Sequence, residues 1–433
     1  MALIRLEKLI FYVFLFSIPF QTRLIVWRWT QPFNEWTAGF IYATDVLIVS
    51  LLVLWLVRII KHPKSFDPMT YHRLGRAGLL LAVFFGVSML SAFNSKIVGL
   101  SFYKLVKLAE FVLLYYYLRS NIGGVFNFRL AAAAIAASGF FQSIIAIGQY
   151  LKQGSLGLKI FGESPVGADI PNVAVFIADG QKYLRAYGAT PHPNVLAAWL
   201  LLAIFAFYFL HLAVARGVIG RFFYGIVLFG FFFTFSRVII GLWALSAVTA
   251  FLLAGQLRKR LGPLIATTLV VSAVFTLAFW PQVRSRLLVS FDEEAVTQRA
   301  FYNRAASSIT RANPFLGIGI GQFAPTLMSQ LKHYPAYFYQ PVHNIYLLIA
   351  SETGLVGLGV FLAFLLNLFW GAIKKSAADR LPTFSFLFLP FAFLAIGIFD
   401  HFLWTSQQGS LILWLIFALI SSKSAAVDKG LLV

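Results

Sequence analysis

Basic side chains and a histidine gather around one polar segment, residues 282–342, which lies between two long apolar runs. The segment carries Arg299, Arg304 and Arg311, and His343 follows it at the start of the next apolar run. Guanidinium groups bind anions such as phosphates through paired hydrogen bonds, and a neutral imidazole can accept a proton near neutral pH. These residue types at the mouth of an apolar helix predict a site that handles an anionic substrate at a membrane surface.

The arginines of this segment fall on two sides of a predicted helix that ends at Asn313. At about 100° per residue, Arg304 and Arg311 project together, whereas Arg299 points roughly 120–140° away from them. Apolar residues supply another side of the helix, so we expect an amphipathic helix that lies on the membrane. Arg304 and Arg311 are then expected to contact lipid headgroups, and Arg299 is separate from that basic stripe.

A second polar loop, residues 152–191, is rich in glycine and proline and is therefore expected to be irregular. Arg185 lies near its end, and His192-Pro193-Asn194 begins the next apolar run, with Pro193 suited to the first turn of a helix. Spacing alone favours a helix-start turn with a solvated arginine. The alternative is that Arg185 binds a phosphate, for which the planar guanidinium group is well shaped.

A further arginine, Arg237, follows Ser236 in a tight turn between two apolar runs. A lone arginine in such a turn most often anchors the chain at the lipid headgroups. That interpretation is favoured over ligand contact, although charged residues at membrane depth are functional candidates by default. Arg237 is therefore a lesser candidate for anion binding.

His343 is the strongest candidate for proton transfer. Nearby guanidinium groups lower the pKa of an imidazole, and a neutral imidazole can act as a general base; the alternative is a histidine at the membrane interface. Glu352 lies nine positions later, about 180° around a straight helix, so it cannot form a dyad with His343. We expect Glu352 to join helices near Gly354. Asp400-His401 is a second candidate pair for acid–base or structural work.

The sequence favours chemistry without a metal or a cofactor. Carboxylates of the polar loops are scattered, there is no His-x-x-x-His pattern, and the chain has no cysteine. The run Gly317-x-Gly319-x-Gly321 follows no predicted strand and lacks a nucleotide-binding fingerprint, so a tight turn is preferred.

Composition places these residues in an all-α polytopic membrane protein. Hydrophobic residues make up 60% of the chain and charged residues 12%, against roughly 45–50% and about 25% in soluble proteins. We predict one integral membrane domain over residues 1–433, and the first apolar run has no cleavage site behind it. About twelve spans are expected, at residues 8–22, 38–60, 74–93, 101–118, 127–151, 192–213, 219–235, 238–254, 262–281, 343–372, 383–400 and 405–422.

The net charge of +20 is distributed as in a membrane protein rather than a nucleic-acid-binding protein. Most basic residues lie in the short loops of one side, which predicts both termini in the cytoplasm and the loops 152–191 and 282–342 outside. Positive charge in these outer loops, and at Lys104 and Lys107, is not needed for topology. We therefore expect it to serve a ligand.

Several of these short sequences, in this order, resemble the O-antigen ligase and polymerase superfamily. The resemblance covers about residues 180–360, and before it the chain is similar mainly in hydropathy. The matching pieces are Arg185-x-x-Gly188 with His192-Pro193-Asn194, Phe235-Ser236-Arg237, Gln298-Arg299, Asn313-Pro314-Phe315-Leu316-Gly317-Ile318-Gly319, and His343-Asn344-Ile345-Tyr346 running to Glu352-Thr353-Gly354-Leu355-Val356-Gly357.

The resemblance implies a helical-membrane (GT-C-like) glycosyltransferase of the bacterial inner membrane, with a helical periplasmic loop and a periplasmic active site. It implies metal-independent transfer of a glycan, with inversion, from undecaprenyl diphosphate to a hydroxyl of a lipid A core sugar. Carried over by motif, Arg185 and Arg299 hold the diphosphate and His343 activates the acceptor. Residues in lesser roles are Arg237 at the diphosphate and Asn344, His192 and Glu352 as supporting residues.

Related functions stay open at this stage. Surface-polysaccharide polymerases and protein O-oligosaccharyltransferases share these motifs. A transporter of lipid-linked sugars would show paired charges inside spans and a repeat between halves, and neither is evident in the sequence. A non-catalytic lipid-binding protein would tolerate the loss of His343.

Overall fold

Helices form most of the protein, and each apolar run predicted from the sequence contains one. The computed structural model describes residues 2–61, 75–213, 217–253, 257–287, 294–331, 334–379 and 383–422. The helices of the apolar runs are α1 (Ala2–Ser17), α2 (Ala43–Lys61), α4 (Gly75–Ser91), α5 (Val98–Asn121), α6 (Phe128–Lys152), α7 (Pro193–Ala213), α8 (Val218–Phe232), α9 (Arg237–Leu253), α10 (Leu257–Ala278), α14 (Ile345–Asp379), α15 (Thr383–Phe399) and α17 (Gln407–Ser421). A helix satisfies its own backbone hydrogen bonds, which a chain in lipid requires.

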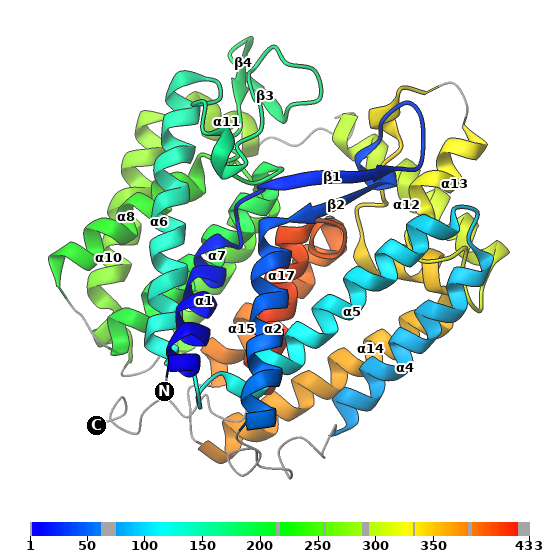
Figure 1. Ribbon diagram of the computed structural model, residues 1–433. Coiled ribbons are helices and arrows are strands. Elements are labelled where there is room, and N and C mark those ends of the chain that lie inside the picture. Colours follow the sequence, from blue (N-terminus) through cyan, green and yellow to red (C-terminus); the bar gives the residue numbers. More distant parts are fainter. Residues whose placement is uncertain are drawn as a thin grey trace.

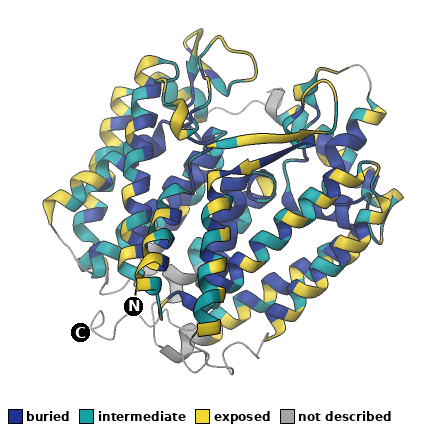
Figure 2. Cartoon of the chain, in the orientation of Figure 1, coloured by how far each residue is buried: buried dark blue, intermediate teal, exposed yellow. Residues whose placement is uncertain are grey.

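Length and composition confirm a helical membrane protein. Six of the described helices could cross a membrane, namely Ala43–Lys61, Gly75–Asn94, Phe128–Lys152, Pro193–Ala213, Arg258–Ala278 and Ile345–Lys374. Shorter apolar helices are Val218–Phe232, Arg237–Thr249, Phe388–Phe399 and Gln407–Ser421. Exposed residues run along the outer helices (Figure 2), and many are large and apolar, such as Leu269 and Leu366. Such extensive apolar surface is typical of a lipid-facing exterior. The total of about twelve spans stays a prediction.

Two small hairpins modify the expected all-α architecture. β1 (Arg23–Arg28) pairs antiparallel with β2 (Ala38–Tyr42), and β3 (Val175–Ala178) pairs antiparallel with β4 (Gln181–Leu184). The helix expected from residue 38 begins only at Ala43, because the preceding apolar residues pair with β1. Both hairpins lie at the same end of the helix bundle, where β1 and β2 cross above α17 (Figure 1).

The polar segment 282–342 also lies at this end of the bundle (Figure 1). It contains α11 (Trp280–Leu287, which starts just before it), α12 (Glu294–Ala312), α13 (Phe323–Gln330) and the 3-10 turn η5 (Ala336–Phe338). The predicted helix is present as α12. The expectation that its apolar side lies on the membrane is wrong, because Tyr302, Ala306 and Ile309 are buried against Phe323 and Leu327 of α13.

α14 is interrupted at Gly354, and the glycine-rich segment after α12 occupies the interruption. Gly354 has a φ of +73° and a ψ of 178°, far from helical geometry. The amide of Gly319 donates to the Glu352 carbonyl (2.9 Å), and the amide of Leu355 donates to the Pro314 carbonyl (2.7 Å). Backbone groups freed by the interruption are therefore satisfied by this segment. The glycine-rich segment Gly317–Gly321 thus packs against α14 and supplies backbone hydrogen bonds at its interruption.

Paired charges are not evident inside the spans from the sequence, but the structure contains ion pairs between helices. Arg58 of α2 donates to both carboxylate oxygens of Glu7 in α1 (2.8 and 3.0 Å), and Tyr117 of α5 donates to Glu7 as well (3.2 Å). In addition, Lys107 of α5 pairs with Asp45 of α2 (2.6 Å). These contacts tie the first helices together where lipid offers no hydrogen bonds.

We predict that Gly354→Ala destabilises the protein by about 2–3 kcal/mol, because only glycine tolerates this backbone conformation and an added Cβ would meet the Phe315 carbonyl oxygen at 2.0 Å. Thermal unfolding in detergent measures the effect. The matched control is Gly359→Ala in the same helix, where an added Cβ meets nothing within 4 Å. Equal unfolding temperatures for the two variants would argue against a structural role for the interruption.

Candidate functional site

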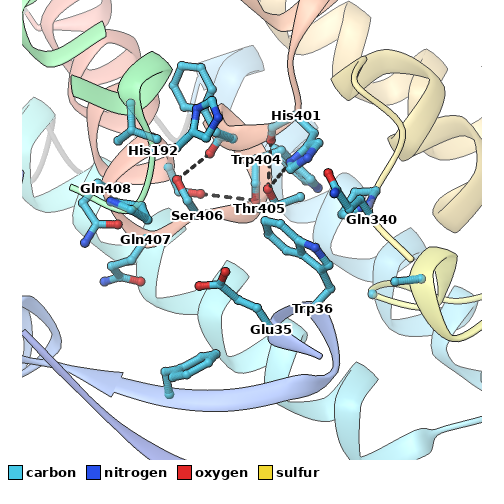
Figure 3. A pocket seen from close by; sticks show the side chains of 18 of the residues that line it. Glu35, Trp36, His192, Gln340, His401, Trp404, Thr405, Ser406, Gln407 and Gln408 are labelled. Atoms are coloured by element: carbon cyan, nitrogen blue, oxygen red, sulfur yellow. Dashed lines mark hydrogen bonds between the residues drawn. The ribbon is translucent and has the colours of Figure 1, made fainter. Parts of the chain in front are cut away.

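A cavity of about 700 Å³ is lined by residues of the β1–β2 hairpin and of both long loops. Its walls come from the hairpin, α5, both loops, the start of α14, and residues 400–414 including α16 (Phe402–Thr405). The predicted site residues that line it are Arg185, His192, Arg299, His343 and Glu352, together with the second candidate pair Asp400 and His401. Figure 3 shows part of this wall.

Arg185 is buried in the wall of the cavity and is held by neutral oxygen atoms. Its Nε donates to the Thr234 carbonyl (2.8 Å), and its Nη2 donates to Asn194 Oδ1 (2.6 Å). Burial and the nearby Arg286 lower the pKa of Arg185 to about 9, so it stays protonated at neutral pH. Within the described part of the chain, no carboxylate forms an ion pair with it. A buried cation without a counter-ion is stabilised by an anionic ligand.

The loop that carries Arg185 is fixed by two glutamines of α6. Gln149 accepts from the amides of Tyr187 and Gly188 (3.0 and 2.8 Å), and Gln142 accepts from the Ala189 amide (2.8 Å). Gly188 adopts a φ of +59°, where an added Cβ would meet the Gln142 side chain at 2.5 Å. The Arg185-x-x-Gly188 spacing thus combines a cavity residue with the turn that positions it.

Asn194 joins three of the sequence motifs. Its Oδ1 accepts from Arg185 and from the Ser236 hydroxyl (3.0 Å), and its Nδ2 donates to Asp400 Oδ2 (2.7 Å). Its backbone amide donates to His192 Nδ1 (3.1 Å), which fixes that nitrogen as an acceptor. Asn194 therefore orients the guanidinium group while linking it indirectly to a carboxylate.

Three histidines surround Asp400 at the cavity. The rings of His343 and His401 meet edge to face with their centroids 4.9 Å apart. Burial lowers the pKa of His192 and His401 to about 3 and also lowers the pKa of His343, with Arg299 adding to the effect. Burial alone would raise the pKa of Asp400, but the imidazoles and Asn194 lower it. The cluster at neutral pH is thus one carboxylate among uncharged imidazoles.

His343 and His401 differ in the hydrogen bonds of their ring nitrogens. The Nδ1 of His343 is buried and has no hydrogen-bond partner among the described residues. By contrast, His401 Nδ1 is hydrogen-bonded to the Thr405 hydroxyl (2.7 Å; Figure 3). No group of three or more His, Asp or Glu side chains in the described ranges is arranged to hold a metal ion.

The structure separates Arg299 from the other arginines of α12, as the helical spacing predicted. Arg299 is half-buried and lines the cavity, while Arg304 and Arg311 are exposed. The buried residues Tyr302 and Ala306, three and seven positions after Arg299, lie on its side of the helix and fix the rotation of the helix. Arg185 and Arg299 thus reach one cavity from different loops.

The remaining predicted residues have contacts that position other groups. Asn344 caps α14, because its Oδ1 accepts from the amides of Tyr346 and Leu347 (2.9 and 3.0 Å), and it does not line the cavity. Arg237 begins α9 and also lies outside the cavity wall. Glu352 lines the cavity and accepts from the Phe323 amide at the start of α13 (3.2 Å). Their functional roles stay predictions.

The β1–β2 hairpin is the part of the site that sequence reasoning missed. It contributes Arg23, Glu35, Trp36 and Tyr42 to the cavity wall, opposite Lys104 of α5. A strand-like run before a glutamine–proline pair is a signal that could have identified it. The signal was obscured because the apolar residues of β2 run directly into α2.

Comparison with known proteins supports the resemblance. Residues 222–362 match the family model described as O-antigen ligase. The matched region extends from α8 into α14 and contains Arg237, Arg299, His343 and Glu352; Arg185, His192 and Asp400 lie outside it. None of the curated proteins matches the chain. Residues 222–362, about a third of the chain, are therefore similar to the O-antigen ligase family.

Proposed function

We propose that the protein is a glycosyltransferase of the O-antigen ligase type. It transfers a glycan from undecaprenyl diphosphate to a hydroxyl of a lipid A core sugar, at the periplasmic face of the bacterial inner membrane. The observation that carries this proposal is the buried guanidinium group of Arg185, which forms no ion pair with a carboxylate of the described residues and shares a cavity with Arg299 and His343.

The two arginines bind the diphosphate of the donor. Arg185 is held by its Nε and Nη2, which leaves the rest of the guanidinium group for the ligand. Arg299 lines the same cavity from α12. Fixed donors aimed at developing negative charge stabilise a leaving group without needing to reorganise. These guanidinium groups supply the charge that a divalent cation would otherwise supply, so the proposed reaction is independent of metal.

His343 accepts the proton of the acceptor hydroxyl. The hydroxyl oxygen forms a bond to the anomeric carbon as the bond from that carbon to the diphosphate oxygen breaks. The bonding electrons leave with the diphosphate, and the hydroxyl proton moves to His343. Direct displacement inverts the configuration of the anomeric carbon.

A polymerase of surface polysaccharides, or a protein O-oligosaccharyltransferase, would use the same donor site with a different acceptor. Deletion in the native host and gel analysis of lipopolysaccharide distinguish these functions. We expect loss of the whole O-antigen ladder with the core intact. A band with a single repeat unit would instead indicate a polymerase, and an unchanged ladder would argue against both.

We predict that Arg299→Lys lowers kcat/KM about ten- to hundredfold, because an ammonium group lacks the planar pair of donors that fits a phosphate. The matched control is Arg304→Ala, which removes an exposed arginine of the same helix and should retain near-normal activity. Full activity in Arg299→Lys, or equal losses in the two variants, would favour headgroup anchoring over donor binding.

We predict that His343→Ala lowers the transfer rate about 10²–10⁴-fold, the usual effect of removing a general base. Binding of undecaprenyl diphosphate and the unfolding temperature should stay near those of the unchanged protein. A variant that unfolds easily but retains full turnover per folded molecule would make His343 structural, and Asp400 or His401 the next residue to test.

The pH dependence of kcat/KM gives a separate test of His343. The uncharged imidazole is the active form, and its pKa lies below the ordinary value of 6.5. Activity should therefore be constant through neutral pH and fall only as the pH drops through this lowered pKa. EDTA should leave the rate unchanged. An acidic limb centred above pH 6.5, or loss of activity with EDTA, would contradict the proposed chemistry.

A further inference from the structure

We infer that the turn of the β1–β2 hairpin is the subsite for a neutral sugar of the acceptor glycan, with Trp36 as its platform. This inference rests on the proposed glycosyltransferase function. It gives a function to the half of the cavity that the hairpin lines, because the diphosphate and the general base are proposed to lie in the other half.

The two halves of the cavity differ in charge. Around Arg185 and Arg299 the described residues offer no ion pair to either guanidinium group. In the hairpin half, Arg23 pairs with Glu35 (2.5 Å), and Lys107 pairs with Asp45 (2.6 Å) and with Glu110 (2.9 Å). Arg23 and Lys107 already have carboxylate partners, so these two cations have little need for an anionic ligand.

Lys104 is the exception in this half, because it lines the cavity near Gly321 and forms no ion pair with a described carboxylate. The remaining lining of this half consists largely of aromatic rings, amides and hydroxyls, including Tyr103 and Gln407. Aromatic surface with a few polar groups is suited to an uncharged ligand that carries many hydroxyls.

Trp36 lies between this half and the proposed base. The ring centroids of Trp36 and His401 are 4.9 Å apart (Figure 3). The ring centroids of His401 and His343 are also 4.9 Å apart. A single imidazole ring, that of His401, therefore lies between the Trp36 indole and His343. The indole is half-buried, and its N–H donates to none of the described residues, so it is available to a hydroxyl.

Two neighbours add hydrogen-bonding capacity. Glu35 uses Oε1 for Arg23, and its Oε2 has no hydrogen bond from the described residues. Gln340 donates through Nε2 to the Tyr337 carbonyl (2.7 Å), which leaves its Oε1 to accept. Figure 3 places Glu35 and Trp36 on one side of the cavity, with Gln340 near His401.

Hydrogen bonds of Asn34 hold the turn that carries Glu35 and Trp36. Asn34 caps the 3-10 turn η1 (Glu35–Thr37) through the Trp36 amide (2.9 Å). Its Nδ2 donates to the carbonyls of Ala336 and Tyr339 (2.8 and 3.0 Å), which belong to the second long loop. The turn of Trp36 is thus hydrogen-bonded to the same loop that carries Arg299.

Binding measurements on the purified full-length protein in detergent test this assignment. The acceptor probe is rough-type lipopolysaccharide, which lacks O-antigen, and the donor-site probe is undecaprenyl diphosphate. We expect Trp36→Ala to weaken binding of rough lipopolysaccharide at least about tenfold and to leave binding of undecaprenyl diphosphate unchanged. Arg299→Ala should give the opposite pattern. Trp36→Phe should restore part of the acceptor binding, because it keeps an aromatic surface.

Trp27→Ala is the matched control, since Trp27 lies in the same hairpin, is 63% exposed and does not line the cavity. Gln340→Ala is a second variant from another element, expected to weaken only acceptor binding. Rough lipopolysaccharide that does not bind the unchanged protein, or binds it and Trp36→Ala equally, would overturn the inference. Undecaprenyl diphosphate that binds Arg299→Ala as well as the unchanged protein would instead count against the proposed function.

Discussion

The burial of the Arg185 guanidinium group is the constraint on which the rest of the site depends. Taking a charge out of water is costly, and a carboxylate at contact distance would be the simplest compensation. The protein instead holds Arg185 with the Thr234 carbonyl and the Asn194 side chain, and places Asp400 on the far side of Asn194. The carboxylate therefore helps to orient the guanidinium group without cancelling its charge. Positive potential is left inside the cavity, where an anionic ligand can complete the ion pair.

The short motifs are spread along the chain because each supplies either a cavity residue or its support. Ser236 and Asp400 meet at Asn194, although Asp400 is more than two hundred positions from it. The interruption at Gly354 receives the backbone of the segment after α12. The nearby Glu352 accepts from the amide of Phe323, the first residue of α13. A general base and a phosphate-binding arginine can be held to within fractions of an ångström only when such supports are rigid. This explains why capping and turn residues recur among residues that touch the cavity.

Features with a local cause were predictable from the sequence, and features made by distant contacts were not. Apolar composition located the helices, and the 100° step per residue correctly separated Arg299 from Arg304. The interruption of α14 at Gly354 was not predicted, because the backbone groups that bond to it come from the segment after α12, far back in the sequence. The membrane-lying interpretation of α12 failed because apolar residues at helical spacing do not show whether lipid or protein covers them. The hairpin that lines the cavity was hidden because β2 and α2 share one apolar run.

In the proposed reaction, the positive potential of the cavity explains why the arginines are charged while the neighbouring His343 is uncharged. Burial and positive neighbours disfavour a protonated imidazole at His343, whereas Arg185 keeps its proton because its pKa, though lowered to about 9, remains above neutral pH. An anionic donor in the cavity would offset part of this potential. Negative charge then grows on the diphosphate as its bond to the sugar breaks, and a nearby anion raises the proton affinity of an imidazole. Departure of the leaving group and proton transfer to His343 would therefore assist each other within the same transition state.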